Sequence, residues 1–206
     1  MNTKKSSTKK STAIDMTAMV DIAFLLLTFL ILTAQAKKPE ILPVDLPLSA
    51  VNSNLPKETA IITISKGKLF FSIENERIRK RALERISEKY NITFTEDEKS
   101  SFSKMDGHGI PLSQMKQVLN LPHNKRPEAS FHNGIPTDSI GTNPSELYDW
   151  IKETRIATKE INNIQLEFAI KGDANESYPT VKKVIDILQS QNINRFHLIT
   201  NLRRTM

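Results

Sequence analysis

The stretch MVDIAFLLLTFLILTA, residues 19–34, is the longest apolar run of the chain and decides its organisation. As a helix rising about 1.5 Å per residue, positions 18–36 reach roughly 28 Å, close to the apolar thickness of a bilayer. The rest of the sequence alternates charged and apolar residues too often to supply a second span. We therefore expect one transmembrane helix over residues 17–36, and a domain outside the membrane.

The flanks of this run predict its orientation. Because acidic residues count for little in the positive-inside rule, lysines decide the comparison. Four of them precede the run and two follow it: Lys4, Lys5, Lys9 and Lys10 against Lys37 and Lys38. This favours a cytoplasmic N-terminus and a periplasmic C-terminal part, if the cell has a periplasm. The same residues also fit a cleavable secretory signal, whose small-x-small site would be residues 34–36.

Asp21 lies inside the apolar run. A carboxylate in the hydrocarbon layer costs about 2.5–3.5 kcal/mol on insertion scales, so such residues usually face protein or water and act there. At about 100° per residue, Asp21 shares a polar stripe with Thr17, Thr28 and Gln35. The stripe predicts a proton or ion site at Asp21, lined by partner helices. Alternatively, Thr28 and Thr33 bond back to carbonyls of their own helix, and Asp21 snorkels to the near interface.

Three segments carry a resemblance to a known family. Thr17 and Asp21, followed by the apolar residues 22–27, are similar to the Thr-Pro-x-x-Asp helix of ExbD and TolR proteins, with Ala18 in place of the family's proline. Residues 42–50 resemble the Leu-Pro segment that follows the family's span. Residues 168–173, Tyr178 and a helix over 181–188 resemble the end of its domain.

This resemblance implies an inner-membrane subunit of a motor driven by the proton motive force. Its helices would sit in a pore formed by an ExbB-like protein, with Asp21 carrying protons and Thr17 and Thr28 facing the pore. The exported domain would form a homodimer and act on a TonB-like partner that energises outer-membrane transport. A TolR-like subunit with a Tol-like partner is the alternative branch. A passive binding module, anchored or secreted, is the alternative class.

Composition argues against other functions. The chain has no cysteine, so disulfides and thiolate chemistry are excluded, and its net charge of +6 over 206 residues does not call for nucleic acid. No phosphate-binding glycine loop or nucleophile elbow occurs. The four histidines lack metal-ligand spacing: His108, His123, His132 and His197. We expect no enzyme, no cofactor and no metal, and we interpret Asp173, beside Gly172, as a turn former.

The rest of the chain predicts an α+β domain with one face of a small sheet covered by helices. Residues 1–16 should be a disordered tail, and the proline-rich residues 37–58 an extended tether with 44–48 as an edge strand. The domain, residues 59–206, should contain a hairpin of strands 60–65 and 69–73, and further strands at 166–170 and 196–200. Helices are expected around 82–90, from an N-cap at Asn143 before Pro144, and at 181–188.

Two segments of this domain allow two interpretations. Residues 91–143 interrupt the family pattern and predict a long loop that either docks a partner or is a decoration of the domain. The basic residues of the first helix, interleaved with glutamates, predict a solvated helix face rather than an anion-binding patch. These basic residues are Arg77, Arg79, Lys80, Arg81 and Arg85.

Overall fold

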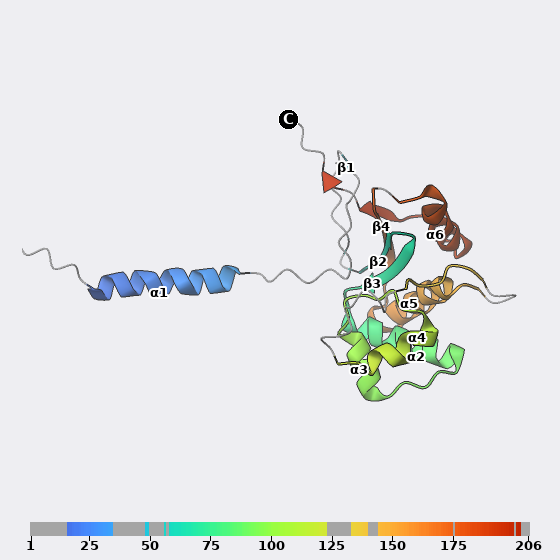
Figure 1. Ribbon diagram of the computed structural model, residues 1–206, viewed down its shortest axis with the longest axis horizontal. Coiled ribbons are helices and arrows are strands. Elements are labelled where there is room, and N and C mark those ends of the chain that lie inside the picture. Colours follow the sequence, from blue (N-terminus) through green and yellow to red (C-terminus); the bar gives the residue numbers. More distant parts are fainter. Residues whose placement is uncertain are drawn as a thin grey trace, which may run out of the picture. The chain divides into compact units, whose positions relative to one another are not determined.

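The computed structural model describes residues 16–34, 48–49, 56, 58–122, 133–139, 144–174, 176–199 and 201–202 (Figure 1). The chain divides into two units, residues 1–39 and 40–206. The predicted tail 1–16, except Met16, and most of the predicted tether 37–58 lie outside the described residues.

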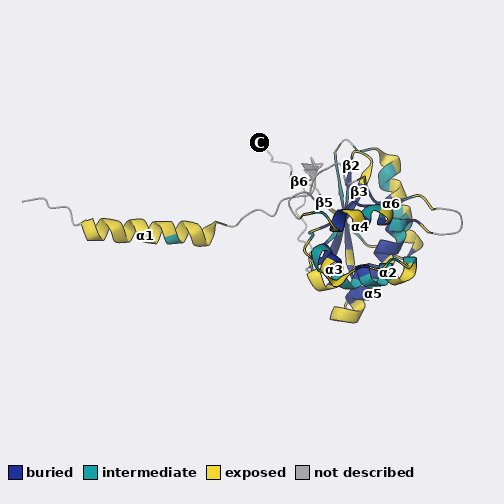
Figure 2. Cartoon of the chain, turned by 60° about the horizontal axis from the view of Figure 1, so that its bottom comes forward, coloured by how far each residue is buried: buried dark blue, intermediate teal, exposed yellow. Residues whose placement is uncertain are grey.

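The first unit contains one helix, α1, Met16–Thr33. Its 18 residues are long and apolar enough to cross a membrane. None of its residues is buried, so it shows yellow along nearly its whole length in Figure 2. α1 begins one residue before the first residue of the predicted span and ends three residues before its last residue. Gln35 lies outside the described residues.

The second unit is built on a four-stranded mixed sheet in the order β3-β2-β4-β5. β2 pairs antiparallel with β3 and parallel with β4, which pairs parallel with β5. Two short strands, β1 and β6, form a separate parallel pair. The bounds are β1 Leu48–Ser49, β2 Thr59–Ser65, β3 Lys68–Ile73, β4 Glu167–Gly172, β5 His197–Ile199 and β6 Asn201–Leu202.

The predicted hairpin is confirmed as β2 and β3. Its two-residue turn places Lys66 and Gly67 at φ values of 52° and 71°. Positive φ at both positions is the type I′ pattern, whose twist matches that of the flanking strands. The Gly67 N–H also donates to the Glu176 carboxylate at 3.1 Å, which ties the turn to the segment before α6.

Three long helices pack with the sheet: α2 Glu76–Tyr90, α5 Glu146–Asn162 and α6 Tyr178–Ser190. Asn91 is the C-cap of α2 and adopts the left-handed conformation, and Asn163 is the corresponding C-cap of α5. The predicted N-cap at Asn143 is wrong. Ser145 caps α5 by accepting a hydrogen bond from the Tyr148 N–H, so Pro144 precedes the helix, and Asn143 lies outside the described residues.

The core lies between one face of the sheet and the helices. Alternate residues of β2, namely Ala60, Ile62 and Ile64, are 0% exposed, whereas Ile61 and Thr63 between them are half-buried. This period-2 pattern is what a sheet shows when helices cover one face. Side chains at helical spacing on one face of α5 are buried: Leu147, Trp150, Ile151 and Thr154. The α+β class with one covered sheet face is therefore confirmed (Figure 2).

The interpretation of residues 91–143 as a long loop is wrong. The segment contains two helices, α3 Glu96–Ser103 and α4 Leu112–Leu119. Thr95 and Glu98 form a capping box that starts α3. Eight apolar side chains of the segment belong to the same hydrophobic core as the sheet: Phe94, Phe102, Ile110, Leu112, Met115, Val118, Leu119 and Ile135.

The inserted segment also extends the sheet past β3. Phe71 and His108 exchange backbone hydrogen bonds of 2.8 and 2.9 Å, forming an antiparallel bridge. Further along the same edge, the Ile135 N–H donates to the Leu69 carbonyl at 2.9 Å. The outer edge of β3 is therefore paired with backbone from the insertion.

Candidate functional site

Asp21 lies in the second turn of α1 and is the only charged residue of that helix. Its neighbours on the helix surface line a shallow depression, formed by Met16, Thr17, Val20, Asp21 and Phe24. Thr17 and Asp21 are four residues apart, so they lie one above the other on the same face. The structure thus places a carboxyl and a hydroxyl together within an apolar surface.

Thr28, the third predicted site residue, uses its hydroxyl within its own helix. Thr28 Oγ1 donates to the Leu25 carbonyl at 2.9 Å, and Thr33 Oγ1 does the same to Phe29 at 2.8 Å. This back-bonding is usual for threonine in helices and leaves the oxygen able to accept a hydrogen bond. A pore-facing role for Thr17 and Thr28 remains a prediction.

The side chains of α1 are exposed, and none of them is buried within the unit that contains the helix. Apart from the half-buried Thr28, every residue of the helix is exposed in the single chain. A lone helix cannot enclose a carboxylate, and backbone bonds within the helix do not solvate it. If the helix spans a bilayer, Asp21 either snorkels to the near interface or lies against helices of other chains and the water that they hold.

In the second unit, two basic residues of α2, Arg79 and Arg85, attach this helix to other elements of the domain. The interpretation of the basic residues as a solvated helix face is therefore wrong for these two. Arg85 donates to Glu153 and Glu160 of α5, both at 2.8 Å. Arg79 is 5% exposed and bonds only backbone carbonyls, including that of Ser103 at 2.8 Å. Because these partners lie far away in the sequence, the pattern of α2 alone does not reveal them.

A second polar contact between α2 and α5 centres on Asp149, which is 1% exposed. One carboxylate oxygen accepts from the Lys89 ammonium and the other from the Tyr90 hydroxyl at 2.7 Å. Burial, together with this hydrogen bond, raises the pKa of Tyr90 well above its ordinary value. Asp149 is thus paired and hydrogen-bonded, as a buried charge needs to be, and it holds two helices together.

The histidines and Asp173 occupy separate places in the described residues. His108 is buried among rings, with centroids 4.4 Å from Trp150 and 5.1 Å from Phe102, and His197 pairs with Glu167 at 2.7 Å. His123 and His132 lie outside the described residues. Across the described ranges, no three carboxylate or imidazole side chains converge on a possible metal position. The Asp173 carbonyl accepts from the Glu176 N–H in the turn after β4.

One family model, described as biopolymer transport protein ExbD/TolR, matches residues 7–202. The chain belongs to the ExbD/TolR family. The matched range begins before α1 and ends at β6, so the family assignment covers both units. No curated protein and no solved structure matches the chain.

ExbD/TolR proteins are non-enzymatic transport proteins of the inner membrane, and they generally work with ExbB/TolQ and TonB/TolA proteins. An N-terminal apolar helix followed by an α+β domain agrees with that class. Sequence reasoning missed the residues that attach the insertion: Arg79, which donates to the Ser103 carbonyl, and Glu146, whose carboxylate accepts from the Leu112 N–H at 2.9 Å. The spacing of Thr95 and Glu98 was a readable signal for the start of α3.

Proposed function

We propose that this ExbD/TolR protein is the subunit of a proton-driven motor in which Asp21 carries protons, energising outer-membrane transport through a TonB-like partner. The observation that carries the proposal is a single carboxylate on an apolar helix of spanning length, in a chain that the family model matches almost throughout.

The proposed mechanism follows from the surroundings of Asp21. In a dry site a carboxyl is driven toward its neutral form, and it releases the proton only when water or a donor reaches it. We place α1 inside a pore of ExbB-like helices, where relative movement would open the Asp21 face to each side of the membrane in turn. Thr17 and Thr28 would offer oxygens to the carboxyl or to water.

The remaining parts of the chain have roles in the same proposal. The N-terminal tail would lie in the cytoplasm, and residues 37–58 would form a tether to a periplasmic domain, residues 59–206. That domain would dimerise and hold the envelope-spanning partner. Because β3 is already paired along its outer edge, the β5 edge is the better candidate for strand addition by that partner.

Replacing Asp21 tests the proton-carrying role. The full chain is expressed with its ExbB-like and TonB-like partners, and uptake driven by the proton motive force is measured. Asp21→Asn preserves size and removes the titration, so we expect uptake to be abolished at unchanged membrane levels of the protein. Undiminished uptake by this variant would refute the proton-carrying role.

Threonine variants provide a matched control on the same helix. Thr28 lies within about 20° of Asp21 around the helix, whereas Thr33 lies about 120° away. Both hydroxyls bond back to the helix, so Thr28→Val and Thr33→Val cost the helix the same type of hydrogen bond. We expect Thr28→Val to lower uptake and Thr33→Val to leave it unchanged. Equal effects would argue against a pore-facing stripe.

The absence of cysteine makes the proposed topology directly measurable. Single cysteines are introduced at Ser7 in the tail and at Gln189, which is exposed on α6. With a membrane-impermeant maleimide on intact cells whose outer membrane has been permeabilised, we expect labelling at position 189 only. Labelling at position 7 only would invert the topology. Loss of residues before position 37 from the mature protein would instead favour a cleaved signal and a passive exported module.

The choice between the two family branches rests on the partner. We favour the TonB-like branch over the TolR-like one because the end of the domain resembles ExbD proteins at residues 168–173 and Tyr178. Cross-linking from position 198, on the open edge of β5, in cells that contain both candidate partners would distinguish them. Capture of a Tol-like protein alone would assign the chain to the envelope-integrity branch.

A further inference from the structure

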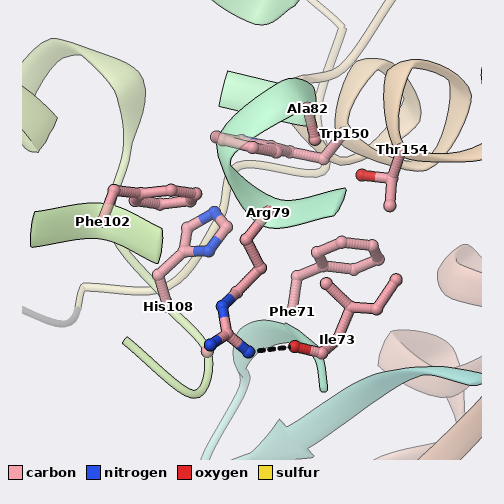
Figure 3. A pocket seen from close by; sticks show the side chains of 9 residues that line it. Phe71, Ile73, Arg79, Ala82, Phe102, His108, Trp150 and Thr154 are labelled. Atoms are coloured by element: carbon pink, nitrogen blue, oxygen red, sulfur yellow. Dashed lines mark hydrogen bonds between the residues drawn. The ribbon is translucent and has the colours of Figure 1, made fainter. Parts of the chain in front are cut away.

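A small cavity lies at the junction of β3, α2, α5 and the inserted segment (Figure 3). Its volume is about 10 Å³. Rings form much of its wall, from Phe71, Phe102 and Trp150, and polar side chains complete it, from Arg79, His108 and Thr154. Every side chain that lines it is 5% exposed or less, so the cavity is internal to the domain.

Thr154 presents a polar atom to this cavity. Its hydroxyl points toward the ring cluster in Figure 3, and the residue is 0% exposed. Thr154 Oγ1 forms no hydrogen bond with any described protein group. The next threonine of α5 behaves differently, because Thr158 Oγ1 donates to the Thr154 carbonyl at 2.8 Å. Thr154 therefore turns away from the usual partner of a helical threonine and faces the cavity.

Trp150, one turn earlier on α5, adds a donor. It is 1% exposed, and its indole N–H likewise has no hydrogen-bond partner among the described protein groups. Buried indole N–H groups and hydroxyls usually find a partner, and leaving one without costs about 1–3 kcal/mol. Two such groups on neighbouring turns of one helix, both from residues that line one cavity, call for a shared partner.

The cavity determines what that partner is. About 10–15 Å³ is the space that one water molecule needs, and a water needs two to four polar neighbours. An apolar guest is disfavoured because it would leave the Trp150 indole N–H and the Thr154 hydroxyl without a hydrogen-bond partner. Anything larger than water does not fit the volume.

We propose that this cavity binds one water molecule, which accepts a hydrogen bond from the Trp150 indole N–H and bonds the Thr154 hydroxyl. Arg79 also lines the cavity, and its guanidinium donates to the Ile73 carbonyl (Figure 3). The water would bridge two turns of α5, in a cavity that residues of α2 and of the inserted segment also line. It is part of the domain's structure and is independent of the proposed motor function.

Thr154→Val tests the proposal by the sign of its effect on folding. Valine is isosteric with threonine and lacks the hydroxyl. In a dry cavity, removing an unbonded hydroxyl would relieve its desolvation cost and stabilise the domain. With the water bound, the same change deletes a hydrogen bond, and we expect the unfolding equilibrium constant to rise about five- to tenfold.

The measurement uses denaturant unfolding of the full chain in detergent, followed by the fluorescence of Trp150, which is the single tryptophan of the chain. Thr158→Val is the control for replacing a helical threonine outside the cavity. A fall in the unfolding constant for Thr154→Val, relative to the wild type, would overturn the proposal.

A second measurement keeps the proposal testable if the valine variant does not fold. With ¹⁵N-tryptophan labelling, the wild-type chain gives one indole N–H signal. We expect a dipolar cross-peak between this proton and water, with slow chemical exchange of the proton itself. A protected indole proton without such a cross-peak would show that no water binds there.

Discussion

The Glu146 carboxylate, in the first turn of α5, accepts a hydrogen bond of 2.9 Å from the backbone N–H of Leu112, the first residue of α4. The N-cap of α4 is Pro111, which forms no side-chain cap bond. First-turn N–H groups have no partner within their own helix. Glu146 therefore caps α4 from another helix, and so attaches the insertion to the rest of the domain.

Replacing Glu146 should destabilise the domain by removing this cap. We expect Glu146→Ala to lower the free energy of unfolding by about 1 kcal/mol, the usual cost of losing a helix cap. Glu146→Gln keeps an oxygen acceptor and should retain most of the stability near pH 5. Denaturant unfolding followed by Trp150 fluorescence provides the measurement. Equal losses for both variants would show that charge, and not capping, matters here.

Glu146 should also make the stability of the domain depend on pH. Burial raises the pKa of Glu146 above its ordinary value of 4.5. The folded chain thus holds this proton more tightly than the unfolded chain, so its stabilising contribution is full below about pH 4.5 and is lost as pH rises through the folded pKa. Glu146→Gln should gain stability relative to the wild type as pH rises from 4 to 7. Glu88→Gln, at an exposed position of α2, is the control for replacing a helical glutamate by glutamine.

The contribution of the surface residue Glu96 to stability should depend on pH in the opposite direction. Hydrogen bonds from Lys99 and Lys80, of 2.7 and 2.9 Å, lower the pKa of its carboxyl to about 2. Its contribution to stability is present above about pH 4.5 and is lost as pH falls toward 2. A carboxyl ¹³C titration should therefore find a midpoint near 2 in low salt, moving upward in Lys99→Met and in high salt. A midpoint near 4.5 in the wild type at low salt would contradict these ion pairs.

Replacing Arg79 should lower the free energy of unfolding more than replacing an exposed residue of α2. Its guanidinium donates to the carbonyls of Ile73, Glu74 and Ser103, the last residue of α3. Arg79→Met leaves those carbonyls without their donor, and we expect a loss of about 2–4 kcal/mol in the free energy of unfolding. Arg77→Met, two residues away and exposed, should change it by no more than about 0.5 kcal/mol. Similar effects of the two changes would refute a special role for Arg79.

Two glycines give a paired test of how closely the insertion approaches the sheet. A Cβ at Gly109 would lie 2.4 Å from ring atoms of Phe70, whereas one at Gly172 would meet nothing within 4 Å. Gly109→Ala should cost about 1–3 kcal/mol through overpacking, and Gly172→Ala should be neutral or slightly stabilising. Thermal or denaturant unfolding distinguishes them. A neutral Gly109→Ala would mean that the insertion moves away from β3 easily.

Local signals in the sequence predicted the parts of the fold that depend on near neighbours. The apolar run predicts α1, and Lys66-Gly67 predicts the hairpin turn. The 3.6-residue period of apolar residues indicates the buried face of α5. Asp21 could be singled out for the same reason, because the free-energy cost of a carboxylate in the hydrocarbon layer follows from the apolar residues around it in the sequence. The N-cap of α5 was misplaced by two residues because Asn143 and Ser145 are both good caps, and only the folded chain selects one.

The insertion could not be recognised in the same way. Its helices are eight residues each, too short to be stable alone, and long-range contacts hold them. Glu146 caps α4 across 34 residues, and Arg79 reaches the end of α3 across 24. No periodicity encodes such pairs. The capping box at Thr95 was readable, but it marks only where a helix starts and not what the helix packs against.

The bridge between Phe71 and His108 also limits how copies of the domain can associate. With the β3 edge occupied, β5 is the one terminal strand of the described sheet without a neighbour on its outer side. A sheet with two open edges can add copies indefinitely and grow into a fibre. A sheet with one open edge can pair with one other copy, after which no edge remains. Strand pairing between copies of this described four-stranded sheet would therefore use the β5 edge of each copy and would join two copies.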